Sequence, residues 1–443
     1  MKNRLSLLIM TGLLLTMSAC NAKSKQNNTT PSGNDPVNPI TPDDPVDPDP
    51  EDPPVDPDPE DPPVDPDPEP EKNSEWDNDA QKVSISTLVA KGNTTDKTHL
   101  YRISGVVQYI SSTTYGNFDI IDNTGSIFVY GCSATSSSIT KSGSNYTFTN
   151  AKNFSTAGVK QGDRVELVGM YTYYTYPNSS YGYSEFEGFV RKIVEKGNYV
   201  LQGKNYTDPE TYSGNYYSSI TATSGTSLAN QLHDLMATTH TSWTTYNGLY
   251  NAYASTGEKS NGKYKCFYSG NYYSSVNREH VWPQSMSENL WGEDHGGSDI
   301  LHVRPANSTY NSQRSNSPFG EIVGENINPK SIAYNGGGQC RYAAKVFEPA
   351  DAIKGDVARI IMYVYLHYST KYGTQQKDWY ASLSLGKVLA PYYDDKCFLL
   401  LRKWNAMDPV SEQEKTMNNY AYSVQGNRNP FIDHPTYADK IWG

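Results

Sequence analysis

The chain has 443 residues, enough for more than one folded domain, and a formal net charge of −11. Fifteen of its 48 acidic residues lie in residues 35–71, and the 33 acidic residues that follow are balanced by 33 basic ones. The low pI therefore does not argue against a nucleic-acid partner, and no large basic surface argues for one. The absence of CxxC and HExxH patterns excludes the common zinc signatures.

Residues 1–20 predict an export signal. Lys2 and Arg4 precede an apolar run that ends in small residues before Cys20. This order is typical of a signal peptide rather than of a membrane-spanning helix. The ending resembles a lipoprotein signal, which implies a mature chain that begins at a lipidated Cys20 and is held in the cell envelope, at the outer membrane or cell surface. An ordinary cleaved signal with an incidental cysteine is the alternative.

Residues 21–80 predict a disordered spacer rich in proline and aspartate. The segment DPPVDPDPE at Asp52–Glu60 repeats verbatim at Asp61–Glu69, and residues 26–71 contain no Lys or Arg. Proline geometry and charge repulsion keep such a segment extended. We interpret it as a spacer between the lipid and the folded chain, with a proline-motif docking site as the alternative.

Residues 81–200 predict an all-β barrel. The candidate strands, separated by turn residues, are Leu100–Ile110, Asn117–Ile121, Ser126–Gly131, Arg164–Tyr173 and Glu185–Ile193. The pattern YRISGVV, FDIIDNTGSIFVY, GDRVELVG resembles an OB-fold, which commonly holds single strands by aromatic stacking. Tyrosines cluster near one loop, namely Tyr171, Tyr173, Tyr174, Tyr176, Tyr181 and Tyr183. A structural spacer or a module that contacts protein or glycan is the alternative.

Residues 275–320 carry the candidate site. Residues 276–282 suit a strand that Pro283 stops, and residues 299–303 suit a second short strand closed by Pro305. In a regular strand Glu279 and His280 point to opposite faces. A site that uses both therefore requires the strand to end or bulge there.

A predicted helix follows, with Asn307, Asn311 and Arg314 at i, i+4 and i+7 on one face. A carboxylate and an amide oxygen are ligands for Mg²⁺ or Ca²⁺ rather than for zinc. A neutral imidazole beside such an ion can take a proton from water. Each residue alone is more often structural, but together Glu279, His280 and Asn311 favour metal-assisted phosphodiester hydrolysis.

Four blocks between about Asn205 and Gly443 resemble the bacterial endonuclease I family, which consists of non-specific secreted or periplasmic nucleases. In the order of that family they read NREHVWPQS, SDILHVRPANSTYNSQRSNSPFG, GDVARIIMYVYLHY and LLRKWNAMDPVSEQEKTMNNYAYSVQGNRNPFIDHP. The resemblance covers more than half of the chain. It implies a C-terminal α+β domain, residues 205–443, of the ββα-metal (His-Me finger) fold.

The resemblance also implies roles for individual residues. His280 matches the general base, and Glu279 and Asn311 match the ligands of a catalytic Mg²⁺, for which Ca²⁺ or Mn²⁺ are alternatives. The resemblance further implies products with 5′-phosphate ends and little choice between DNA and RNA.

Two departures from the family pattern stand out. Many relatives have a His-His pair in the second block, whereas here Leu301 replaces the first and His302 remains. Some relatives carry an arginine that contacts the cleaved phosphate in an insert after the first block, and the corresponding connection here contains none. Arg304 and Arg314 are the nearest candidates for that role. His302 and Arg428 are further candidates for substrate contact, with a structural role for Arg428 as the alternative.

The remaining C-terminal segments predict buried helices. The apolar spacing of residues 228–236 places His233 on a polar face, and Asp356 is expected to cap an apolar helix that ends at Tyr368. Ser411 and Glu414 form a capping-box pattern. Besides Cys20 the chain has four cysteines whose spacing defines no disulfide, namely Cys132, Cys266, Cys340 and Cys397.

The sequence thus predicts a multidomain, lipid-anchored and extracytoplasmic nuclease, with an N-terminal all-β OB-like barrel and DNA, RNA or both as substrate. A catalytically inactive surface lipoprotein that binds nucleic acid or glycan is the main alternative, supported by the spacer, the tyrosine-rich loop and Leu301. A calcium-dependent phosphodiesterase for small substrates is a third. The joint presence of Glu279, His280 and Asn311 favours the nuclease.

Overall fold

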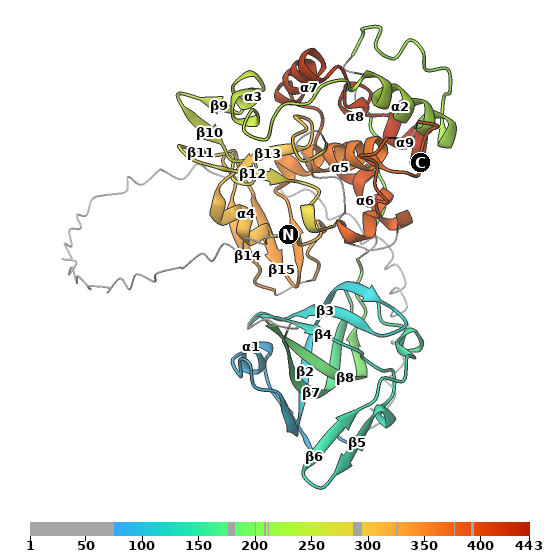
Figure 1. The fold of residues 1–443 in the computed structure, drawn as a ribbon. Coiled ribbons are helices and arrows are strands. Elements are labelled where there is room, and N and C mark those ends of the chain that lie inside the picture. The colour runs from blue at the N-terminus through green and yellow to red at the C-terminus, as the bar shows by residue number, and fades with distance from the viewer. Residues whose placement is uncertain are drawn as a thin grey trace, which may run out of the picture. The chain divides into compact units, whose positions relative to one another are not determined.

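The computed structural model (Figure 1) describes residues 75–175, 182–199, 201–207, 210, 212–286, 295–324, 327–375, 377–390 and 394–443. The predicted signal peptide, Cys20 and nearly all of the predicted spacer lie outside the described residues, as do Tyr176 and Tyr181. Within the described ranges, no helix has both the length and the apolar character needed to cross a membrane.

Five strands of the N-terminal part close into a barrel. Around the barrel the strands are β2 (Asp96–Ser112), β3 (Asn117–Ile121), β4 (Ser126–Val129), β8 (Gly182–Glu195) and β7 (Arg164–Thr175), and β7 pairs back with β2. The β4–β8 pair is parallel and the other pairs are antiparallel. All five strands predicted from the sequence are confirmed, although β2 begins at Asp96 rather than Leu100 and β8 at Gly182 rather than Glu185.

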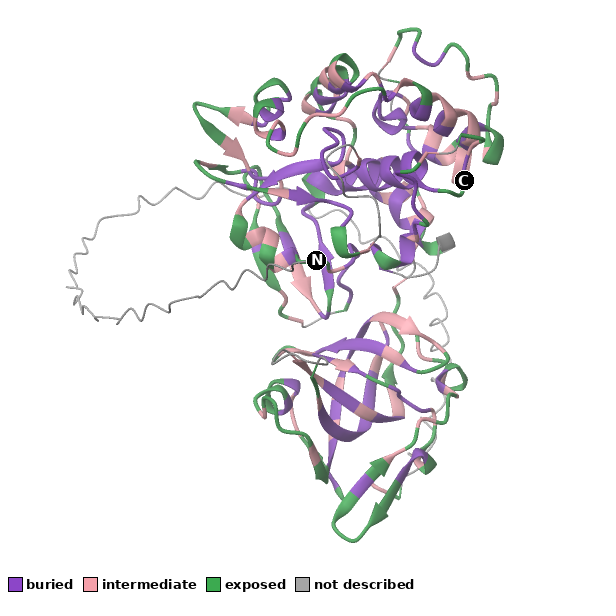
Figure 2. Cartoon of the chain, viewed as in Figure 1, coloured by how far each residue is buried: buried purple, intermediate pink, exposed green. Residues whose placement is uncertain are grey.

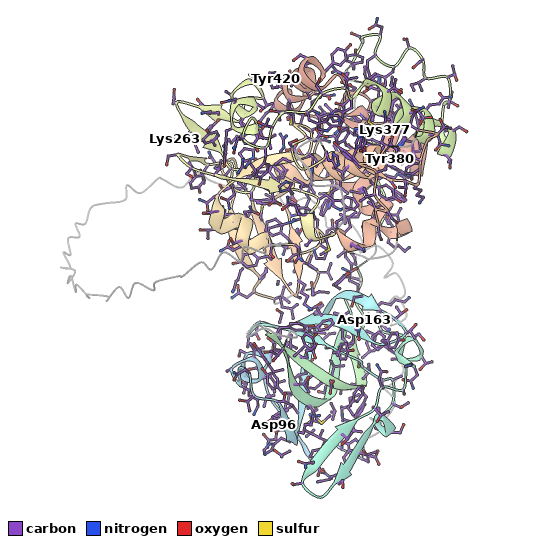
Figure 3. All side chains as sticks on the ribbon, in the orientation of Figure 1. Asp96, Asp163, Lys263, Lys377, Tyr380 and Tyr420 are labelled. Atoms are coloured by element: carbon purple, nitrogen blue, oxygen red, sulfur yellow. The ribbon has the colours of Figure 1, made fainter. Side chains whose placement is uncertain are left out.

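Short elements surround this barrel. They are β1 (Ala80–Lys82), α1 (Ile85–Val89), the 3₁₀ turns η1 (Ser136–Ser138) and η2 (Phe154–Ala157), and the hairpin of β5 (Ile139–Ser142) and β6 (Asn145–Phe148). Two aspartates labelled in Figure 3 fix its turns. Asp163 accepts hydrogen bonds from the backbone N–H groups of Lys160 and Gly197, both at 2.9 Å, and Asp96 accepts one from Thr98 at 3.0 Å. These bonds hold the chain where it enters β7 and β2.

Helix α5 (Lys354–Tyr368) forms the centre of the C-terminal part, and every residue of it except Asp356 is buried (Figure 2). This all-round burial explains why its sequence shows no polar stripe. The other helices of the region are α2 (Gly225–Thr239), α3 (Leu249–Ser255), α4 (Ser308–Arg314), α6 (Asp394–Met407), α7 (Glu412–Gln425), α8 (Pro430–Asp433) and α9 (Tyr437–Trp442). Of these, α2, α6 and α8 pack against α5, and α7 contacts it through the ion pair of Glu414 with Arg359 at 2.6 Å.

The described residues of the C-terminal part also form three small sheets. One contains β9 (Lys259–Ser260), β10 (Lys263–Lys265) and β11 (Tyr272–Tyr273), and another contains β14 (Lys330–Ala333), β15 (Gln339–Ala343) and β16 (Val346–Glu348). The third pairs β12 (Asn277–His280) with β13 (Val303–Ala306). The described 3₁₀ turns of this part are η3 (Gln284–Met286), η4 (Asp351–Ile353) and η5 (Leu385–Lys387).

Two details of the helix predictions were wrong and one is confirmed. His233 is buried rather than on a polar face, because its side of α2 packs against α5, where Nδ1 lies 2.7 Å from the carbonyl oxygen of Leu366. Asp356 lies in the first turn of α5 instead of capping it, because η4 starts the turn earlier. The capping box of α7 is confirmed: Ser411 Oγ accepts from the N–H of Glu414 at 3.2 Å, and Glu414 Oε2 accepts from the N–H of Ser411 at 2.8 Å.

The question of disulfides is answered for the described cysteines. Cys132, Cys266, Cys340 and Cys397 are all buried, and none of them forms a disulfide. Burial raises the pKa of the Cys340 thiol to about 12, so this thiol stays protonated and acts as a small core group.

Candidate active site

The candidate site is built on β12, β13 and α4, in that order along the chain. The two strands are antiparallel, with Glu279 opposite Arg304 and His280 opposite Val303. β12 ends at His280, shortly before Pro283. This strand end lets two neighbouring residues, Glu279 and His280, line the same cavity, as the sequence required of a shared site.

The second strand lies later than predicted. Residues 299–302 form a turn, and the strand runs from Val303 to Ala306 with Pro305 inside it. The turn forms because Asp299 accepts the N–H of Leu301 on its side chain at 2.8 Å and the N–H of Val303 on its carbonyl at 3.0 Å. Pro305 is tolerated because β13 belongs to a two-stranded sheet and is therefore an edge strand.

An open cavity of about 480 Å³ brings together four of the predicted site residues. They are Glu279 and His280 from β12 and Asn311 and Arg314 from α4. The sequence separates these two pairs by about thirty residues, and the β12–β13–α4 arrangement places them at one surface.

His280 is oriented by its surroundings. Its Nε2 lies 3.2 Å from the carbonyl oxygen of Gly297, and its ring stacks near the ring of Tyr246, with 5.9 Å between centroids and 20° between planes. Burial lowers the pKa of His280 to about 4, and the nearby Arg278 and Arg314 also lower it. The imidazole is therefore neutral at pH 7, which is the state required of a proton acceptor.

Glu279 is almost fully buried next to a cation. Its Oε1 accepts a hydrogen bond from Tyr268 Oη at 2.7 Å and lies 3.3 Å from Nη1 of Arg314. Burial raises the pKa of Glu279, and the charge of Arg314 and the Tyr268 hydroxyl oppose that rise. Arg314 also donates to the carbonyl oxygen of Val281 at 2.7 Å, which ties α4 to the end of β12.

Asn311 supplies a second oxygen at the cavity. Its side chain is half-buried, and its amide makes no hydrogen bond to any described residue. An amide oxygen that accepts no hydrogen bond from the described residues and a carboxylate in one open cavity fit the donor preference of Mg²⁺, Ca²⁺ and Mn²⁺. Among the described residues, no group of three or more His, Cys, Asp or Glu side chains could hold a metal, so any ion here depends on these two protein oxygens together with water and substrate.

His302 lies behind the cavity rather than in it. Its Nε2 accepts a hydrogen bond from the N–H of Trp282 at 3.0 Å, and its Nδ1 donates to the carbonyl oxygen of Gly296 at 2.7 Å. The ring contacts that of His280 with 5.8 Å between centroids. His302 thus supports the loop and the ring that form the site. Leu301 is fully buried in the apolar core.

Arg304 and Arg428 are held elsewhere in the domain. Arg304 pairs with Glu258 at 3.0 Å, contacts Ile300 and Met417, and lines a different cavity. Arg428 donates from two nitrogens to the carboxylate of Asp433, at 2.6 and 2.8 Å. Both guanidinium groups are buried and committed to these protein partners.

Sequence reasoning missed Arg278 and Tyr246, which also line the cavity. One available signal was strand alternation, because Arg278 and His280 are two residues apart and share a face of β12. Nothing in the sequence indicated Tyr246, which is brought to the cavity by the segment before α3.

A buried polar network fixes the turn that leads into β13. Asp299 Oδ2 accepts from the hydroxyls of Tyr363 and Tyr368 at 2.6 and 2.7 Å, and Oδ1 accepts from Gln425 Nε2 at 2.9 Å. Gln425 in turn accepts the N–H of Ile300 at 2.7 Å. The network therefore joins residues of the second, third and fourth sequence blocks at one buried position.

A neutral imidazole, a carboxylate and an amide oxygen at one open cavity define a candidate hydrolase site. Comparison with known families makes the class specific. The model of the family described as Endonuclease I matches residues 205–436, just over half of the chain. The chain belongs to this family of nucleases, and the resemblance drawn from the four sequence blocks is confirmed.

Individual relatives agree with this family. The chain is 35% identical over 254 residues to a protein named extracellular ribonuclease from Bacillus amyloliquefaciens, across 53% of this chain and 80% of the relative. It is 34% identical over 255 residues to a protein of the same name from Bacillus subtilis (strain 168), across 54% and 80%. It is 27% identical over 139 residues to a protein named endonuclease-1 from Buchnera aphidicola subsp. Baizongia pistaciae (strain Bp), across 30% and 46%.

Proposed function

We propose that the chain is an exported, lipid-anchored endonuclease that hydrolyses phosphodiester bonds of DNA, RNA or both with little sequence preference. The observation that carries the proposal is the convergence of Glu279, His280 and Asn311, which match the family motif, in one open cavity. The names of the relatives, extracellular ribonuclease and endonuclease-1, support a nucleic-acid substrate and an extracellular location. The succession of β12, β13 and α4 supports the ββα-metal fold.

His280 acts as the general base. A carbonyl oxygen can only accept a hydrogen bond, so the contact with Gly297 places the ring proton on Nε2 and leaves the lone pair on Nδ1. Nδ1 takes a proton from a water molecule whose oxygen attacks the phosphorus. The new P–O bond forms while the bond to the 3′ oxygen breaks, which leaves a 5′-phosphate and a 3′ oxygen that takes a proton from solvent water to become a hydroxyl; His280 then releases its proton to solvent.

Glu279 and Asn311 are the residues that would hold a divalent cation. Mg²⁺ is commonly bound through one or two carboxylates, keeps several waters and takes further oxygens from substrate phosphates, so two protein oxygens are sufficient. When bound, the ion supplies stabilisation of the negative charge that develops on the phosphoryl group and on the departing 3′ oxygen. Arg314, paired with Glu279, holds the carboxylate toward α4.

In this proposal the N-terminal segments attach the nuclease domain to the cell envelope and hold it at a distance from the membrane. Lipidation of Cys20 anchors the chain in the cell envelope, and the acidic spacer separates the anchor from the catalytic domain. A closed five-stranded barrel whose third and fifth strands pair in parallel supports the OB-fold assignment. Tyr115, Tyr130 and Tyr174 are exposed on this barrel, and they are the groups to examine if it contacts nucleic acid.

The test is a cleavage assay of the full chain on plasmid DNA and on single-stranded RNA, with Mg²⁺, Ca²⁺, Mn²⁺ or EDTA. We expect both substrates to be degraded, EDTA to stop degradation, and His280→Ala to reduce kcat by about 10²- to 10⁴-fold with an unchanged thermal unfolding curve. Lys263→Ala is the control, because Lys263 is exposed on β10 (Figure 3) and does not line the cavity.

Two outcomes would contradict the proposal in different ways. A folded His280→Ala variant that cleaves at the wild-type rate would remove the general-base role of His280. Intact DNA and RNA with every metal would favour the inactive lipoprotein instead, and binding of nucleic acid and of glycans by the full chain would then be measured.

A further inference from the structure

We propose that Arg278 binds a backbone phosphate of the nucleic acid that enters the cavity of His280. This inference rests on the proposed function and assigns a substrate-binding role to a residue that neither the sequence reasoning nor the comparisons single out. Three observations support it: the balance of charge in the cavity, the way the guanidinium is held, and its position relative to His280.

The charges that line the cavity do not cancel. Arg314 is paired with Glu279 at 3.3 Å, whereas Arg278 forms no ion pair with any described carboxylate. By contrast, Arg304 and Arg428 are each paired with a buried acid. Among the described residues that line the cavity, one positive charge is therefore left uncompensated, and a phosphodiester is the anion that a nuclease must bind.

The guanidinium of Arg278 is held in place by neutral groups. Its Nη1 donates to the carbonyl oxygen of Tyr246 and to Oδ1 of Asn247, both at 2.9 Å. Its central carbon lies 3.4 Å from the centre of the Tyr246 ring and 4.7 Å from that of Tyr250. Neutral acceptors and aromatic faces orient the group without removing its charge, so binding a phosphate requires little further ordering.

One side of the guanidinium remains available. Nε is buried and has no hydrogen-bond partner, and Nη1 is engaged as described, while Nη2 makes no hydrogen bond to any described residue. The side chain as a whole is half-buried and lines the open cavity. The two N–H donors of Nη2 are therefore the groups that meet a phosphate oxygen.

The position of Arg278 matches this task. Arg278 and His280 are two residues apart on β12 and share a face, which separates their backbones by roughly 7 Å. A phosphodiester beside the imidazole of His280 then lies within reach of the long side chain of Arg278. The alternative is purely structural, with Arg278 serving only to pack the tyrosines of the 246–250 segment against β12.

Salt dependence of binding separates these two roles. Affinity of a fluorescent DNA duplex is measured between 50 and 300 mM salt in the His280→Ala background, which prevents cleavage. If Arg278 neutralises one phosphate, Arg278→Gln should reduce the slope of log affinity against log salt by about 0.9. The control Lys377→Gln removes a positive charge from a residue that does not line the cavity (Lys377 is labelled in Figure 3) and should leave the slope unchanged.

An unchanged slope in a folded Arg278→Gln variant would overturn the inference. If that variant does not fold, Arg278→Lys carries the test in the cleaving enzyme, since lysine keeps the charge and lacks the planar fork. We expect Arg278→Lys to lower kcat/KM on polymeric DNA by about tenfold, and an unchanged kcat/KM would also overturn the inference. If the wild-type chain neither binds nor cleaves nucleic acid, the proposed function itself fails; a loss confined to Arg278 variants cannot be mistaken for that result.

Discussion

Two groups of polar side chains in the C-terminal domain both come from the four sequence blocks and are used in opposite ways. Around Asp299, each carboxylate oxygen accepts two hydrogen bonds, and the donors include Tyr363, Tyr368 and Gln425. At the cavity, the amide of Asn311 and Nη2 of Arg278 make no hydrogen bond to any described residue. The hydrogen bonds of the first group fix the backbone, whereas the polar groups of the second are available to bind a ligand.

The same contrast separates two histidines whose rings touch. His302 uses both ring nitrogens inside the protein, on Trp282 and Gly296, and burial lowers its pKa to about 3. His280 is oriented through Nε2 and lines the open cavity. Hydrogen bonds to both ring nitrogens make His302 a structural residue. The sequence alone does not show this difference, because both residues are histidines within the candidate site.

The largest expected effect is a loss of stability on acidification, because acid charges buried histidines. His240, His302 and His367 are buried, and burial lowers the pKa of each below 6.5. The unfolded chain therefore takes up more protons below pH 6.5, and the free energy of unfolding should fall as pH falls from 6.5 toward 4. At pH 5 each histidine should contribute a loss of about 2 kcal/mol.

Urea unfolding at pH 7.5, 6 and 5, followed by tryptophan fluorescence, measures this loss. The variant His302→Gln is less stable at every pH but should show a smaller dependence on pH, by up to about 1.4 kcal/mol per pH unit, because one titrating group is gone. Stability that does not change between pH 7.5 and 5 would mean that these rings are protonated in the folded chain without cost.

Removal of the Asp299 carboxylate should have the next largest effect. Asp299→Ala leaves two tyrosine hydroxyls, one side-chain amide and one backbone N–H without their acceptor in a fully buried site. We expect a loss of about 3 to 5 kcal/mol in the free energy of unfolding, and a smaller loss in Asp299→Asn, which keeps one acceptor oxygen. Chemical denaturation of both variants at pH 7.5 measures the difference.

The contrast with His280→Ala sharpens this prediction. His280→Ala should reduce kcat and leave stability nearly unchanged, whereas Asp299→Ala should reduce stability and retain most of kcat at a temperature where it is folded. Loss of activity without loss of stability in Asp299→Ala would place Asp299 in the catalytic machinery instead of the scaffold.

Local patterns predicted much of this architecture. Alternation and turn residues located the five barrel strands, and Pro283 with the adjacent Glu279 and His280 required the strand end that β12 has. The helical spacing of Asn311 and Arg314 placed both at the cavity. In each of these cases the deciding interactions lie within a few residues along the chain.

The features that the sequence did not predict depend on contacts between residues far apart in the chain. Arg304 pairs with Glu258 and does not line the cavity of His280, and Arg428 pairs with Asp433 within a buried loop. A single sequence shows an arginine but not its partner, so the sequence analysis named Arg304, which pairs with Glu258, and overlooked Arg278, which pairs with no described carboxylate. The shift of β13 has a similar cause, because Asp299 is held by residues of α5 and α7 that no local rule connects to it.

The smallest predicted effect compares two asparagines on one short helix. Asn307 is the N-cap of α4, where its Oδ1 accepts the N–H of Thr309 at 3.0 Å, and Asn311 lines the cavity. Asn307→Ala should cost about 1 kcal/mol of stability and leave the Mg²⁺ requirement unchanged. Asn311→Ala should leave stability nearly unchanged and raise the Mg²⁺ concentration needed for half-maximal cleavage. Metal titrations and thermal unfolding of both variants measure this. An unchanged titration in Asn311→Ala would remove Asn311 from the ligand set, and an equal shift in both variants would mean that the placement of α4, rather than the amide oxygen, controls metal binding.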